Sequence, residues 1–200
     1  MFPLGTVLFP YARLPLHVFE PRYRVMTRHV IAGDQEFGVV LIERGSEVGG
    51  GDTSFDVGTV ARVVRAAELA DGRFALDTIG TRRIRVHRWL PDDPFPRAEV
   101  VALDEPSATP GAFGARDRVV GALEELVAVA RTIDPGVTEI PAIDPDPQRA
   151  AYEAAALAPI GPLDAQRVLE SPNAEARLAL LASLISERAA ELRARRALDD

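Results

Sequence analysis

The spacing of apolar residues changes near residue 105, and this change constrains the fold more than any other feature of the sequence. Before it, short apolar runs, some of them alternating with polar residues, are separated by turn-forming residues, which is typical of β-strands. After it, apolar residues recur every three or four positions, as they do in amphipathic helices. Residues 105–114 hold two prolines and two glycines and are the predicted linker. The sequence therefore predicts an α+β protein with its strands first and its helices last.

About seven short strands are predicted in residues 1–105. Each is an apolar or alternating run bounded by residues that favour turns. Asp71-Gly72 stands between two of these runs and is typical of a tight hairpin. The strands are expected at residues 4–9, 14–19, 37–42, 57–69, 74–79, 82–90 and 97–103. Short strands in this number favour a closed or nearly closed β-barrel, because closure hides the edges of a sheet.

One helix is predicted among these strands. It begins at Pro21, since proline suits the first helical position. Tyr23, Met26 and Val30 follow at helical spacing and are expected to face the core. The segment 45–56 contains three consecutive glycines and is predicted to be a loop.

Four helices are predicted to pack as a bundle in residues 112–200. The first carries an apolar stripe formed by Val119, Leu123, Leu126, Ala130 and Ile133. The last and longest carries a second stripe formed by Leu178, Leu181, Ile185, Ala189 and Leu192. Between them the sequence predicts an alanine-rich helix that starts at Pro147 and a short helix over residues 163–169.

Lysine and cysteine are both absent, and all 23 basic residues are arginine. Without lysine there is no Walker A loop, no Schiff-base catalysis and no serine–lysine dyad. Without cysteine there is no disulfide, thiolate nucleophile or cysteine-bound metal. The three histidines, His17, His29 and His87, lack the spacing of metal ligands. The sequence therefore predicts no catalytic residue, no metal site and no cofactor, and the protein is not expected to be an enzyme.

The net charge of −7 disfavours a dedicated nucleic-acid binder. Residues 1–105 carry 13 arginines against 15 acids, and residues 106–200 carry 10 against 15. One predicted strand nevertheless places Arg83, Arg85 and His87 on the same side, because alternate residues of a strand point the same way. RNA binding through this arginine face is the alternative hypothesis, and a solvated sheet face is the competing interpretation. An enzyme acting on a small molecule is a third hypothesis, which requires a deep pocket with converging acids.

No run of about 18 apolar residues occurs, so no membrane span is predicted. The opening residues have no signal-peptide core, and the lack of cysteine fits a reducing compartment. A cytoplasmic location is therefore expected. The apolar stripe of the last helix is compatible with a monomer or a homodimer, since the same stripe is needed inside the bundle.

Several segments, in order along the chain, resemble the substrate-binding domain at the N-terminus of Lon proteases. The most specific are residues 2–10 (FPLGTVLFP) and 14–23 (LPLHVFEPRY). The others are residues 37–42 (FGVVLI), 57–62 (VGTVAR), 71–74 (DGRF), 80–86 (GTRRIRV) and 164–170 (DAQRVLE).

This resemblance implies a PUA-like β-barrel over residues 1–105 and an α-helical bundle over residues 112–200. It also implies recognition of unfolded or tagged proteins, without the ATPase and protease parts of Lon. The expected function is therefore that of a noncatalytic protein- or peptide-binding module, serving as an adaptor or quality-control factor. Its expected partners are unfolded or tagged protein segments, with neither a membrane nor nucleic acid among them.

The corner between the second predicted strand and the first helix is the candidate peptide site. Apolar side chains there would border a groove for an extended peptide, and a phenylalanine between two prolines would offer a loop contact. Glu20 is also expected to stabilise the positive start of the helix. The predicted peptide-binding residues are Leu14, Leu16, Phe19, Glu20, Arg22, Tyr23 and Phe95.

Overall fold

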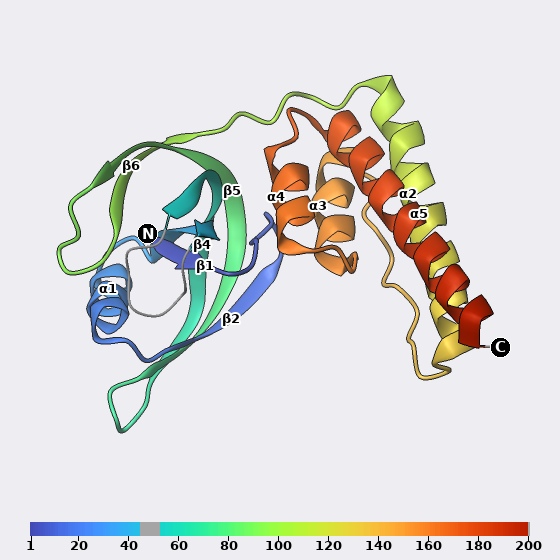
Figure 1. The fold of residues 1–200 in the computed structure, drawn as a ribbon. Coiled ribbons are helices and arrows are strands. Elements are labelled where there is room, and N and C mark those ends of the chain that lie inside the picture. Colours follow the sequence, from blue (N-terminus) through green and yellow to red (C-terminus); the bar gives the residue numbers. More distant parts are fainter. Residues whose placement is uncertain (45–52, 200) are drawn as a thin grey trace. The chain divides into compact units, whose positions relative to one another are not determined.

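The computed structural model of the protein describes residues 1–44 and 53–199. The chain divides into two compact units, Met1–Asp104 and Glu105–Asp200. In the described part, the first unit contains six strands and one helix, and the second contains four helices (Figure 1). Most of the loop predicted at 45–56 lies outside the described residues, and from Thr53 onward the chain is already in a strand. Within the described part, none of the helices combines the length and the apolar character needed to cross a membrane.

The first unit is built on one mixed sheet of six strands. Along its main path the strands lie in the order β1 (Phe2–Leu4), β3 (Glu36–Arg44), β4 (Thr53–Glu68), β5 (Phe74–Leu90) and β2 (Arg13–Val18). β1 runs parallel to β3, and the other pairs are antiparallel. The sixth strand, β6 (Arg97–Ala102), pairs with the second half of β5, whereas β2 pairs with its first half.

The sheet is not closed into a barrel, so the predicted closure is wrong. β1 and β2 lie at the two ends of the strand path, and within the described chain they do not pair with each other. β5 is the longest of the described strands and runs for 17 residues. It pairs with β4 on one side and with β2 and then β6 on the other, so one long strand serves two partners in succession.

β5 is continuous, although the sequence predicts two strands separated at Gly80-Thr81. Gly80 lies directly against the preceding segment of chain: a Cβ at this position would be 2.1 Å from the carbonyl oxygen of Phe9. Gly80 accepts a hydrogen bond from the Tyr11 N–H (2.8 Å) and donates one to the Ala12 carbonyl (2.9 Å). This glycine is therefore required by a close backbone contact and not by a turn.

The predicted hairpin at Asp71-Gly72 is confirmed. Gly72 has a φ of 77°, a left-handed conformation that favours glycine. The Asp71 carboxylate accepts a hydrogen bond from the Arg73 N–H at 3.1 Å, which stabilises the turn. β4 and β5 therefore meet in a tight connection, as the sequence indicates.

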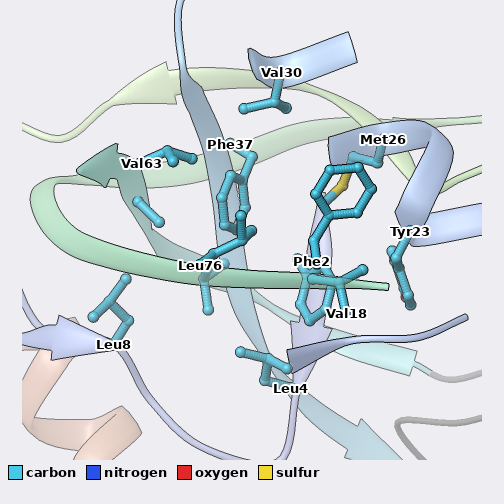
Figure 2. Packing of buried hydrophobic residues seen from close by; sticks show 13 residues of the cluster. Phe2, Leu4, Leu8, Val18, Tyr23, Met26, Val30, Phe37, Val63 and Leu76 are labelled. Carbon is cyan, nitrogen blue, oxygen red and sulfur yellow. The ribbon is translucent and has the colours of Figure 1, made fainter. Parts of the chain in front are cut away.

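The predicted helix is α1 (Pro21–Ala32), and the face predicted to be buried is buried. Its residues Tyr23, Met26 and Val30 pack into the core cluster of the first unit, which Figure 2 shows from close by. The ring centres of Phe2 and Tyr23 are 4.2 Å apart, so β1 and α1 meet in this core. The other members of the cluster are Leu4, Leu8, Val18, Phe37, Val39, Ala61, Val63, Phe74 and Leu76.

The second unit consists of two long and two short helices. The long ones, α2 (Pro110–Ile133) and α5 (Ala174–Asp199), lie side by side (Figure 1). They run in the same direction, because the start of α2 contacts the start of α5 through Thr109 and Glu175, and Glu125 pairs with Arg193 further along. The shorter helices are α3 (Pro147–Leu157) and α4 (Pro162–Glu170). This arrangement is less regular than the predicted four-helix bundle.

One arginine lies fully inside the second unit. The guanidinium of Arg177 is stacked over the ring of Tyr152, 4.2 Å from its centre, and donates to the carbonyls of Val168 (3.3 Å) and Ser171 (3.2 Å). It also lies 3.6 Å from the carboxylate of Glu105, which accepts a hydrogen bond from the Tyr152 hydroxyl. This network fixes the first residue of the unit to its helices.

Candidate functional site

The corner between β2 and α1 holds four of the predicted peptide-site residues. Glu20 is the N-cap of α1, but its carboxylate makes no capping hydrogen bond to the backbone. Instead it pairs with Nε of Arg22 at 3.2 Å. The Arg22 guanidinium also lies 4.5 Å from the ring centre of Tyr23. Glu20 and Tyr23 therefore hold the arginine head group in one place.

A hollow of about 380 Å³ is bordered by Arg22, and we call it the corner pocket. Its apolar lining consists of Pro3, Trp89, Leu90 and Pro96. Its polar lining consists of Arg22, Thr53, Ser54 and Asp92. Trp89, the only tryptophan of the chain, is exposed there. Opposite charges and an apolar wall therefore face the same small volume.

The α-amino group of Met1 lies next to this pocket and donates to the carbonyl of Pro96 at 2.6 Å. Burial lowers the pKa of the Met1 α-ammonium to about 6, and the nearby charge of Asp92 opposes that shift. With such a pKa the amine is mostly uncharged at neutral pH. Arg22 is then the cation of the corner pocket under those conditions.

A second hollow, of about 460 Å³, lies along β2, and we call it the strand pocket. It is lined by Pro15, Leu16 and His17 from β2, Arg65 and Ala67 from β4, and Ala75, Leu76 and Asp77 from β5. β2 is the last strand of the sheet path and pairs only with β5 among the described strands. Among the described strands, the edge of β2 that faces away from β5 has no partner strand, and the strand pocket extends from β2 across β5 to β4.

The structure separates the seven residues predicted for peptide binding. Arg22 borders the corner pocket and Leu16 the strand pocket, whereas Phe19 is 53% exposed at the corner itself. Tyr23 is buried in the core and presents no ring at the surface. Leu14 and Phe95 are half-buried against the core cluster. Two of the seven residues therefore line hollows, and each lines a different one, while Glu20 pairs with Arg22.

The arginine face predicted from β5 does not exist as one exposed surface. Arg85 and His87 are exposed, but Arg83 is only 3% exposed. The pairing between β4 and β5 shifts register here: Thr59 pairs with Arg83 and Ala61 with Gly80, so two steps on β4 match three on β5. The shift lies between Gly80 and Arg83, whereas Arg83 and Arg85 pair in regular register with Thr59 and Val57. The two arginines therefore share one side of β5 and differ in how far that side is covered. Nothing in the structure or the comparisons supports the RNA-binding alternative.

The best-organised charge cluster of the sheet is structural in character. Glu36 of β3 accepts hydrogen bonds from Arg62 of β4 at 2.9 Å and from Arg82 of β5 at 2.8 Å. Burial acts to raise the pKa of Glu36, but the hydrogen bonds from the two arginines outweigh it and lower the pKa below its usual value. Among residues 1–44 and 53–199, no three His, Asp or Glu side chains come together as a metal site would require.

Sequence reasoning missed the corner pocket, because its lining comes from segments far apart in the chain. Pro3 belongs to β1, Thr53 and Ser54 begin β4, and Trp89 ends β5. One residue could have indicated this pocket from the sequence. Trp89, the single tryptophan, stands just before a proline-rich turn, where a large apolar ring is easily left at the surface.

Comparison of the chain with models of protein families identifies its family. The model of the ATP-dependent protease La (LON) substrate-binding domain matches residues 1–187 of the chain. The chain belongs to this family. The match concerns the LON substrate-binding domain and not the ATPase or protease domains of Lon proteases.

Several relatives of this LON domain carry the name Lon protease. Lon protease 2 of Herpetosiphon aurantiacus is 27% identical over 188 residues, which cover 92% of this chain and 23% of the relative. The Lon protease of Cytophaga hutchinsonii is 33% identical over 102 residues, which cover 50% of this chain and 12% of the relative. The chain thus spans less than a quarter of the length of these relatives.

Solved Lon domains have a similar fold. The Lon N-terminal domain protein from Xanthomonas campestris has a TM-score of 0.66 and 25% identity, covering 91% of this chain and 95% of that chain. The N-terminal domain of Mycobacterium avium complex Lon protease has a TM-score of 0.62 and 18% identity, covering 92% and 97%. These similarities agree with the strand-rich and helical units described above.

Proposed function

We propose that this LON domain is a noncatalytic module that binds exposed apolar segments of unfolded or tagged proteins. Membership of the LON substrate-binding domain family is the observation that carries the proposal. In this proposal the module works in the cytoplasm as an adaptor or quality-control factor, delivering or holding chains that other proteins process. The module itself only binds these chains, and we place the binding surface on the first unit.

The edge of β2 supports a mode of binding in which an extended segment adds to the sheet. Such an addition supplies main-chain hydrogen bonds, while alternate side chains of the segment enter neighbouring hollows. The strand pocket, with Leu16 and Leu76 in its lining, begins at β2 and extends over β5 and β4. Pro15 cannot donate a hydrogen bond, so the added strand would be short. A short strand with apolar contacts suits weak binding of many different sequences.

Phe19 supports apolar contact at the end of the same strand. It follows β2 directly and is 53% exposed. Transfer of a phenylalanine side chain out of water is favourable, so this exposed ring is available for an apolar contact. Burial of this ring by a bound segment would contribute about 1 kcal/mol, which is roughly a fivefold change in Kd.

A matched pair of variants tests the proposal. Fluorescence anisotropy would measure binding of the protein to labelled reduced, carboxymethylated α-lactalbumin, with native α-lactalbumin as the folded control. Phe19→Ser should weaken binding of the unfolded protein about fivefold. Phe113→Ser is the control, because Phe113 is also 53% exposed but lies on α2 in the second unit. Equal binding of folded and unfolded protein, or equal effects of both variants, would contradict the proposal.

A further inference from the structure

The corner pocket has a property that apolar segment binding does not use: a cation with unused donors. A guanidinium carries five N–H donors. Only Nε of Arg22 is engaged, by Glu20, so four donors have no hydrogen-bond partner among the described residues. One of the terminal nitrogens, Nη2, is also shielded from water. A ligand therefore meets the other terminal nitrogen, Nη1, which is neither shielded nor hydrogen-bonded among the described residues.

Arg22 is positioned to bind a planar anion. Its head group is held by the Glu20 carboxylate and the Tyr23 ring, so little side-chain entropy remains to be lost on binding. The side chain is 17% exposed, and it borders the corner pocket. With Nε bonded to Glu20 and Nη2 shielded from water, Nη1 is the nitrogen that a ligand can reach, and a carboxylate accepts a charge-assisted hydrogen bond from it.

The rest of the lining indicates what the carboxylate is attached to. Trp89, Pro3 and Pro96 give an apolar wall within the same hollow of about 380 Å³. A C-terminal residue carries its carboxylate and its side chain on one carbon atom, so both reach a small pocket together. Thr53 and Ser54 add hydroxyl groups for the last peptide group. Asp92 also lines the pocket and opposes an anion there.

We propose that the corner pocket binds the C-terminal carboxylate of an unfolded polypeptide, with an apolar last side chain against Trp89. This inference rests on the proposed function and names one chemical group of the substrate. Chain ends become accessible in unfolded and truncated proteins, so a site for them adds selectivity that internal apolar segments do not provide. The β2 edge and the corner pocket would then contact different parts of the same bound chain.

Trp89 makes the test direct, because the chain has no other tryptophan. Its emission would be followed while the full chain is titrated with the peptide acetyl-Gly-Ser-Ser-Ala-Leu-Leu as the free acid, and with the same peptide as the amide. The acid should change the emission and bind about tenfold more tightly, which corresponds to one charge-assisted hydrogen-bonded pair. An amidated peptide with an internal glutamate should behave like the plain amide.

Three variants define the site. Arg22→Gln should abolish the difference between acid and amide, whereas Arg28→Gln, on the same helix but paired with Glu68, should keep it. Asp92→Asn should tighten acid binding several-fold, and this result holds even if Arg22→Gln fails to fold. Equal affinity for acid and amide overturns the inference. If the unfolded protein still binds in that case, the proposed function stands; if it also fails to bind, both are wrong.

Discussion

Replacing the buried arginine of the helical unit should be far more costly than replacing an exposed one on the same helix. Arg177→Met keeps most of the side-chain volume but removes two hydrogen bonds to carbonyls and the ion pair with Glu105. Each bond from a charged donor contributes about 1.5 kcal/mol at these distances, and breaking a buried ion pair costs about 3–5 kcal/mol. Because Glu105 keeps its bond from Tyr152, we expect a loss of about 3 kcal/mol.

Urea unfolding followed by circular dichroism at 222 nm measures this loss, since four of the five described helices lie in the second unit. A loss of about 3 kcal/mol lowers the midpoint by roughly 1.5 M for an m-value of about 2 kcal/mol/M. Arg193→Met is the matched control, because Arg193 also lies on α5 and pairs with Glu125, but both are about half exposed. That pair should contribute less than about 1 kcal/mol. Equal costs for the two variants would refute the reasoning.

Two further predictions concern the strand-rich unit and a third concerns the helical unit. Glu36→Gln should cost about 1 kcal/mol at neutral pH, since its carboxylate is only 15% exposed and binds Arg62 and Arg82. Because the folded-state pKa of Glu36 is lowered, this stabilisation is complete above the ordinary carboxyl pKa and is lost as the pH falls below it; unfolding measured from pH 7 to pH 3 should therefore be less acid-sensitive in the variant. Gly80→Ala should cost about 2 kcal/mol in urea unfolding followed by the fluorescence of Trp89, which lies on the same strand, because the added Cβ meets the backbone carbonyl of Phe9. Gly121→Ala, on α2 with open space around it, should instead stabilise by about 0.5–1 kcal/mol, and a loss there would show that the glycine is needed.

Local features of the fold could be predicted from the sequence. The spacing of Val119, Leu123 and Leu126 places them on one face of a helix, and all three are buried in α2. The predicted apolar stripe of α2 extends too far, because Ile133 at the end of the helix is exposed. Periodicity shows which residues share a face, but it does not show how far a partner helix covers that face. The hairpin at Asp71-Gly72 could be predicted because the preference of these residues for a tight turn is local.

Features that depend on distant contacts could not be predicted. Gly80 looks like a turn residue, and only the approach of Phe9 from another segment explains it. The number of strands suggested closure, but closure depends on strand lengths and register, which alternation does not specify. Alternation predicts that Arg83 and Arg85 share one side of β5, but it does not show that this side is covered at Arg83 and open at Arg85. In each case a partner far away in the chain decides the outcome.

The candidate site was predictable only in part. Phe19 and Arg22 stand next to each other in the corner because they are close in sequence, and one is exposed while the other borders a pocket. Tyr23 is a predicted site residue because it is adjacent to Arg22 in sequence, but its position on α1 buries it in the core. Trp89, which also lines the corner pocket, lies 67 residues after Arg22 in the chain, and no local pattern connects the two.

Hydrogen–deuterium exchange of the protein with and without reduced, carboxymethylated α-lactalbumin tests the central claim most directly. If the first unit binds unfolded chains, exchange should slow in β2 and in the start of α1 when the unfolded protein is added, and native α-lactalbumin should have no such effect. Protection confined to residues 105–199, or no protection at saturating concentrations, would contradict the account.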